Sequence, residues 1–172
     1  MSTQKQDEKH VSTEIVKAKS GYWNLLLIAT AVLLLTSLMI LALPLNEAAG
    51  EITVYKSPAC GCCSKWAEHL KDAGFRVKTI DLDNVNDIKL STGVLPGLQS
   101  CHTAVVDGYV IEGHVPAADI KKLLQERPAD VTGLAAPGMP MGSPGMESEI
   151  KKPYQVLAFN KEDGRTSVYA SH

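Results

Sequence analysis

The chain has 172 residues, with 17 Lys and Arg against 19 Asp and Glu and a formal net charge of -2. This length allows one ordinary domain beside a single apolar segment. The near-neutral charge, without a basic stripe interleaved with aromatic residues, excludes nucleic acid as an expected partner.

An uncharged apolar segment near the start of the chain predicts a membrane helix. Residues 25–43 carry no charge, and as a helix they would reach about 28 Å, close to the hydrocarbon thickness of a bilayer. Tyr22 and Trp23 precede the segment as interfacial aromatic residues, and the lysines before them place the N-terminus in the cytoplasm. A cleaved signal peptide is the alternative, but Glu47 interrupts the small-residue pattern of a cleavage site. We therefore expect an uncleaved anchor.

The exported part begins with strands and helices in alternation. A β-rich run at 52–56 is followed by a Ser-Pro breaker, and apolar residues then recur at helical spacing as far as Gly74, which ends the helix. A second strand is predicted at 75–82, followed by a helix capped by Asp83 or Asn84.

The next elements are predicted from turn chemistry. A hairpin is expected at 103–106 and 109–111, because the Asp-Gly pair between them suits a type I′ turn. Pro116 then opens a helix that stops before Pro128.

Residues 132–148 are rich in Gly, Pro and Met, and we expect no regular structure there. A final hairpin follows at 154–159 and 165–169. The β-α-β-α-β-β-α order, with cysteines after the first strand, predicts an α/β fold of thioredoxin-like type, with an N-terminal transmembrane helix and a C-terminal β-hairpin extension. The expected parts are a cytoplasmic tail at 1–21, a transmembrane signal anchor at 22–45, a thioredoxin-like metal-binding domain at 51–130, and a loop and hairpin at 131–172 packed on the same domain.

Three of the four cysteines, Cys60, Cys62 and Cys63, lie within four residues, and the fourth is Cys101. The three neighbours cannot close a long loop among themselves, and a structural disulfide from Cys101 to one of them would leave two spare thiols. At a helix N-terminus the thiolate is favoured, and crowded thiolates need protons, an oxidised pair or cations between them. Sulfur ligands select Cu(I) or Zn(II), and adjacent cysteines whose sulfurs bridge ions favour several Cu(I) ions.

Other side chains are candidate donors. His102 is either an imidazole ligand or an ordinary turn histidine, because adjacent strand residues point to opposite sides. Met139 and Met141 either donate thioethers to Cu(I) or cover apolar surface. His69 and His114 are expected to be structural or solvated, with a place near the site as the alternative for His114. The candidate metal ligands are therefore Cys60, Cys62, Cys63, Cys101, His102, Met139 and Met141.

Four motifs resemble those of the CopG-type periplasmic copper-resistance proteins, a thioredoxin-like metal-binding family: Val-Tyr-Lys-Ser-Pro-x-Cys-Gly-Cys-Cys, Ser-Cys-His-Thr-Ala, Glu-Gly-His-Val-Pro and Gly-Met-Pro-x-Gly-Ser-Pro-Gly-Met. The resemblance runs from the first strand to the C-terminal hairpin. It implies a cysteine-bridged copper site made by Cys60, Cys62, Cys63 and Cys101, and cycling of copper between Cu(I) and Cu(II). The membrane anchor lies outside the resemblance. The uncharged segment and the lysines before it predict a single-pass bacterial inner-membrane protein with its C-terminal domain in the periplasm, and tethering would keep the site near a copper exporter or a redox partner.

Three functions stay open at this point. The first is a copper-binding protein of copper tolerance, with or without copper oxidoreductase activity. The second is a membrane-anchored thiol–disulfide oxidoreductase in which Cys60 attacks and Cys63 resolves. The third is a zinc- or disulfide-stabilised interaction domain that uses the terminal hairpin as its binding edge.

Overall fold

The computed structural model describes residues 28–36 and 50–172. Its contacts divide the chain into two units, Met1–Asn46 and Glu47–His172.

The first unit contains a helix at 28–36 whose large apolar side chains, such as Leu33 and Leu34, are exposed. Within the part of the chain that the structure describes, no helix has the length and apolar character needed to cross a membrane. The tail expected at 1–21 and the remainder of the anchor expected at 22–45 lie outside the described residues.

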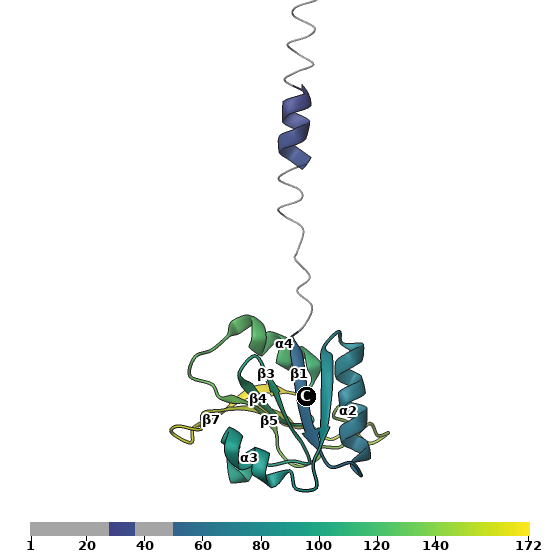
Figure 1. Ribbon diagram of the computed structural model, residues 1–172, viewed down its shortest axis with the longest axis vertical. Helices are drawn as coiled ribbons and strands as arrows, with labels where there is room; N and C mark the ends of the chain where they lie inside the picture. Colours follow the sequence, from purple (N-terminus) through teal and green to yellow (C-terminus); the bar gives the residue numbers. More distant parts are fainter. Residues whose placement is uncertain (1–27, 37–49) are drawn as a thin grey trace, which may run out of the picture. The chain divides into compact units, whose positions relative to one another are not determined.

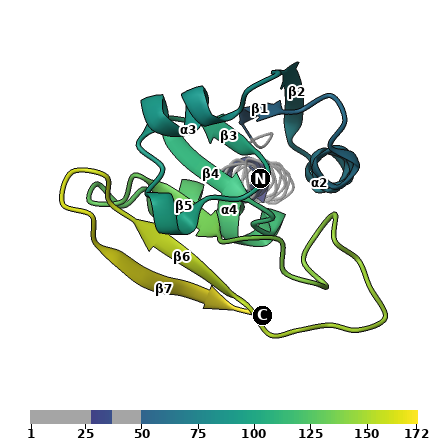
Figure 2. The same ribbon diagram turned by 90° about the horizontal axis from the view of Figure 1, so that it is seen from below.

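The second unit is a mixed sheet of seven strands with helices packed against it (Figure 1, Figure 2). The strands lie in the order β2-β1-β3-β4-β5-β6-β7, with parallel pairing for β1/β2 and β4/β5 and antiparallel pairing elsewhere. This confirms a mixed α/β protein. The elements are β1 Glu51–Lys56, α2 Gly61–Asp72, β2 Arg76–Asp81, α3 Asn86–Thr92, a 3-10 turn Pro96–Leu98, β3 Thr103–Val106, β4 Tyr109–Gly113, α4 Ala117–Glu126, β5 Gly133–Ala136, β6 Gln155–Phe159 and β7 Thr166–Ser171.

Two apolar clusters cover the two faces of the sheet. The larger contains Trp66 of α2 and Ile120 of α4, and the smaller contains Val94 and Leu98, which follow α3. Val110 belongs to the smaller cluster, and the next residue, Ile111, belongs to the larger one. This is expected because successive side chains of a strand point to opposite faces of the sheet. Figure 2 shows α3 and α2 at different sides of the twisted sheet.

The predicted β3–β4 hairpin is confirmed, including its turn. Asp107 and Gly108 have φ of 47° and 86°, and positive φ at both central residues is what a type I′ turn requires. The turn fixes the register of the hairpin, so that Thr103 lies opposite Glu112. The C-terminal hairpin of β6 and β7 is also confirmed.

One prediction was wrong: the Gly, Pro and Met-rich segment 132–148 contains a strand. β5 occupies Gly133–Ala136, is fully buried, and pairs with β4 on one side and β6 on the other. A Cβ on Gly133 would overlap the carbonyl oxygen of Val110. This glycine therefore permits close approach of two strands, and it does not mark a loop.

The helix α3 buries a lysine and exposes a leucine, which is the reverse of the usual arrangement in an amphipathic helix. Leu90 is 71% exposed, whereas Lys89 is 2% exposed, and its Nζ donates hydrogen bonds to Thr103 of β3 and Glu112 of β4. Gly93 ends the helix in the left-handed region, with φ of 81°.

Candidate metal centre

Cys60, Cys62 and Cys63 lie where β1 gives way to α2. Cys60 is the N-cap residue of α2, and its amide donates to the Ser57 carbonyl across the preceding turn. Cys60 and Cys63 form a disulfide, and Cys62 and Cys101 are free thiols. The alternative of a disulfide from Cys101 to the cluster is therefore not the one that forms.

Cys101 is brought to this turn by the sheet. It immediately precedes His102 and β3, whose first residues pair with the end of β1. Its Sγ lies 3.4 Å from Cys63 Sγ and 3.9 Å from Cys62 Sγ, while Cys60 Sγ and Cys62 Sγ are 3.5 Å apart. All four sulfurs lie within 4.8 Å of one another, in an arrangement that suits a metal ion.

A second donor group shares Cys101. It consists of Cys101, His102 and His114, whose ligand atoms also lie within 4.8 Å of one another. His114 follows β4, is fully buried, and places Nε2 3.1 Å from Cys101 Sγ. Its Nδ1 donates to the Pro144 carbonyl at 2.8 Å, which leaves the Nε2 lone pair facing the sulfur.

The structure gives His114 the alternative that the sequence left open, a place near the site. The sequence contained a signal for this position. The two-residue turn that sets Thr103 opposite Glu112 also sets Cys101 opposite His114, two residues further from the turn on each strand. His69, in contrast, is structural as expected: its Nε2 accepts a hydrogen bond from the Ala117 amide at 3.1 Å.

His102 is enclosed between two aromatic rings. Its centroid lies 4.3 Å from that of Trp66 and 5.0 Å from that of His114, and its Nδ1 is 3.4 Å from Cys101 Sγ. Burial, followed by the nearby charges of His114 and Lys89, holds the pKa of His102 well below its usual range. The ring is therefore neutral, which is the form that binds metals. Its buried Nε2 has no hydrogen-bond partner among the residues that the structure describes.

Cys101 is a thiol at neutral pH. Burial, together with the neighbouring Cys62, raises the pKa of Cys101 to about 11. The expected preference for thiolate at the α2 N-terminus does not extend to this cysteine, because it lies outside the helix on a partly buried segment. A metal ion bound here must displace the proton.

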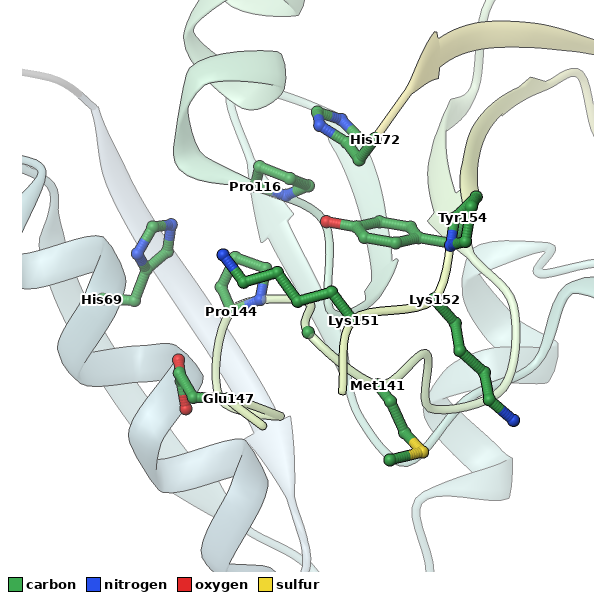
Figure 3. Close-up of a pocket in the computed structure, with 11 residues that line it drawn as sticks. His69, Pro116, Met141, Pro144, Glu147, Lys151, Lys152, Tyr154 and His172 are labelled. Atoms are coloured by element: carbon green, nitrogen blue, oxygen red, sulfur yellow. The ribbon is translucent and has the colours of Figure 1, made fainter. Parts of the chain in front are cut away.

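The two loop methionines have different surroundings. Met139 is 54% exposed. Met141 lines a pocket of about 640 Å³ together with His69, Glu147 and Tyr154 (Figure 3). Their role as copper ligands stays a prediction.

The donor chemistry of the centre suits a soft cation. Four sulfurs and two imidazoles make up the two groups, and neither contains a carboxylate. Soft thiolates with imidazoles select Cu(I) or Zn(II) over hard cations such as Mg²⁺ or Ca²⁺. While the disulfide is closed, Cys62 and Cys101 alone offer thiols, so the full sulfur set becomes available on reduction of Cys60 and Cys63.

Fold and site together define a mixed α/β protein with a cysteine and histidine centre for a soft metal. A family model described as "Protein of unknown function, DUF411" matches residues 98–146, the segment that carries Cys101, His102 and His114. Two solved structures, described as Form 2 and Form 1 of copper resistance protein CopG, are each 43% identical to the chain. Each comparison covers 72% of this chain and 98% of the solved one, with TM-scores of 0.68 and 0.67. No curated protein matches. The chain belongs to the CopG family of copper resistance proteins.

Proposed function

We propose that the protein is an exported, membrane-tethered copper-binding protein of copper tolerance that holds Cu(I) in a multinuclear thiolate site. One observation carries this proposal: the sulfurs of Cys60, Cys62, Cys63 and Cys101 lie within 4.8 Å of one another. The 43% identity to structures named copper resistance protein CopG supports copper as the cargo.

The shared position of Cys101 supports more than one copper ion. Cys101 belongs both to the four-sulfur group and to the group with His102 and His114. A thiolate sulfur bridges two Cu(I) ions readily, whereas adjacent cysteines wrap a single tetrahedral ion poorly. The bridging thiolate therefore joins a sulfur-rich position to a position with imidazole donors.

The Cys60–Cys63 disulfide supports redox cycling of copper as a further part of the proposal. Oxidation of the two thiols to the disulfide releases two electrons and two protons, which is enough to reduce two Cu(II) ions to two Cu(I). Return to the dithiol takes two electrons and two protons from an external dithiol, the class of redox partner that the proposal requires.

The sequence and the strand pairing support the proposed fold and cellular location of the site. The order β1-α2-β2-α3-β3-β4-α4 supports a thioredoxin-like assignment for 51–130, and the pairing of β5 with β4 supports inclusion of 131–172 in the same domain. The uncharged run at 25–43 and the exposed apolar side chains of the 28–36 helix support a single-pass anchor in the bacterial inner membrane. That topology places the site in the periplasm, within reach of a copper exporter.

A Cu(I) titration tests this function. The full-length chain, reduced without oxygen, is titrated against a competing Cu(I) chelator while free thiols are counted. We expect uptake of more than one Cu(I) per chain with all four thiols masked. Uptake of one ion or none, with thiols left free, would reject the multinuclear site.

Thiol–disulfide exchange is the second candidate, and the observed Cys60–Cys63 disulfide at a helix N-terminus favours it. This function predicts reduction of protein disulfides by the metal-free chain with a dithiol as electron source, and loss of that activity in Cys60→Ser. A metal-free chain that reduces no disulfide would exclude it.

A further inference from the structure

A buried ion pair lies directly behind the metal centre. Lys89 of α3 is 2% exposed, and Glu112 of β4 is 0% exposed. Their Nζ and Oε1 atoms are 2.5 Å apart. Neither residue belongs to the two donor groups.

The carboxylate of Glu112 binds both sides of the segment that carries the donors. Its Oε1 accepts from the Ser100 amide at 2.6 Å, and its Oε2 accepts from Thr103 Oγ1 at 2.6 Å. Lys89 Nζ also donates to Thr103 Oγ1, at 3.1 Å. Ser100 and Thr103 are the residues immediately before and after Cys101-His102, so the network fastens the segment at both ends.

The same carboxylate connects this segment to the remaining imidazole. Glu112 lies two residues before His114 in the chain, and the next residue, Gly113, donates its amide to the His102 carbonyl at 3.0 Å. The side-chain network of the ion pair and the Gly113 backbone contact therefore both link the two segments whose Cys101 and His114 approach to 3.1 Å.

Stability alone is a weak reason for such a pair. Removing two charges from water carries a desolvation penalty that the mutual attraction often fails to exceed, and well-packed apolar residues of similar volume commonly replace buried pairs without loss of stability. A fully hydrogen-bonded pair that fixes the positions of ligand-bearing segments has a specific use, because partners behind metal ligands orient the ligands themselves.

We propose that Lys89 and Glu112 are positioning residues that hold the Cys101-His102 segment in the geometry required for metal binding. The inference rests on the proposed function, since the geometry matters only if the centre binds a metal.

The test uses Glu112→Gln in the full-length chain with two readouts. In the reduced protein we expect Cu(I) affinity, measured against a competing chelator, to fall by about 10- to 100-fold. In the metal-free protein with the Cys60–Cys63 disulfide closed, we expect faster alkylation of Cys101, because the hydrogen bonds from Ser100 and Thr103 to residue 112 are weakened. A folded variant with wild-type affinity and a wild-type alkylation rate would overturn the proposal.

A double variant, Lys89→Met with Glu112→Leu, separates positioning from stability and replaces the first if the glutamine variant unfolds. Removal of both charges is expected to leave a folded protein. Cu(I) affinity is nevertheless expected to stay reduced, because Ser100 and Thr103 have lost their acceptor. Recovery of wild-type affinity in the double variant would show that charge balance, and not positioning, is what the pair supplies.

Leu123→Ala is the matched control, since Leu123 is a core residue of α4 and has no part in the network. It is expected to lower the unfolding midpoint and leave Cu(I) affinity unchanged. An equal loss of affinity in this variant would assign the effect to general destabilisation and reject the positioning role. If the wild-type chain binds no Cu(I), the proposed function fails, while the alkylation rates still report whether the pair holds Cys101.

Discussion

Cys101 is the residue at which the two donor groups meet. Its sulfur lies within 3.9 Å of two cysteine sulfurs and within 3.4 Å of two imidazole nitrogens. Its position on a partly buried segment keeps it a thiol until a metal displaces the proton. Loss of this sulfur should therefore affect both groups at once.

We expect Cys101→Ser to lower the Cu(I) bound by the reduced chain to about half of the wild-type amount, because a hard hydroxyl oxygen replaces the shared soft donor. Metal analysis of the desalted complex measures the ratio. His172→Gln serves as the control, since His172 binds Asp119 and belongs to neither donor group. An unchanged copper ratio in Cys101→Ser would contradict the shared-sulfur arrangement.

Sequence spacing was sufficient to group the four cysteines, because three of them sit in one helical turn and the fourth precedes a predicted strand. His114 was not counted among the candidate ligands because its partner is 13 residues away and the contact depends on hairpin register. Lys89 was missed for a different reason. A lysine in a short amphipathic helix is usually solvated, and only the tertiary position of Glu112 reveals that it is buried.

Among the helices, α2 and α4 are joined by one histidine. His69 of α2 accepts a hydrogen bond from the amide of Ala117, the first residue of α4. Only the neutral ring can accept through Nε2. Burial lowers the pKa of His69, against the opposing charges of Glu147 and Asp72.

This contact predicts a pH-dependent contribution to stability. Because the folded-state pKa of His69 is lowered, its contribution is complete above the unfolded value of about 6.5, and it is lost as pH falls through the folded pKa. We expect the free energy of unfolding of the metal-free, disulfide-closed chain to decline between pH 7 and pH 5 more steeply than that of His69→Gln. Glutamine retains an acceptor and does not titrate, and the other histidines are the same in both chains. Parallel curves would show that His69 does not cap α4.

The loop after β5 packs against the first turn of α2 through Gly145. Its φ is +81°, and a Cβ there would lie 2.6 Å from the Cys62 carbonyl oxygen and 2.9 Å from the Trp66 amide nitrogen. Gly138 has a similar φ of +70° but open space around the Cβ position. The two glycines therefore differ in packing and share the same conformational strain.

We expect Gly138→Ala to destabilise the protein by about 1–2 kcal/mol, the cost of a left-handed non-glycine residue. Gly145→Ala should cost about 3 kcal/mol or more, since its methyl group also overlaps backbone that cannot move freely. Urea unfolding measures both changes. Gly145→Ala should in addition weaken Cu(I) binding, because the loop carries the Pro144 carbonyl that orients His114. Equal losses of stability in the two variants would show that the loop does not pack tightly against the turn that carries Cys60, Cys62 and Cys63.

Most elements were predictable because each has a local cause. The period of α2 and α4, the proline before α4 and the Asp-Gly turn are all encoded within a few residues. β5 was not predictable in the same way. Its four residues form a strand because β4 and β6 flank them, and β6 begins 19 residues after β5 ends.

In the protein as a whole, the sheet brings three separate segments to one end. β1 ends beside the start of β3, since Tyr55 pairs with Thr103, and the end of β4 lies on the other side of β3. The segment after β1 carries Cys60, Cys62 and Cys63. Cys101-His102 precedes β3, and His114 follows β4. The metal centre is thus a consequence of strand order, with the buried pair of Lys89 and Glu112 behind it.

The most direct measurement is a Cu(I) titration of the full-length chain in two states, one with the Cys60–Cys63 disulfide closed and one fully reduced, with free thiols counted at each step. The account predicts more than one Cu(I) per reduced chain with all four thiols masked, and a lower ratio and weaker binding in the disulfide form. Equal binding in both states, or no tight binding in the reduced state, would contradict a copper site built from all four cysteines.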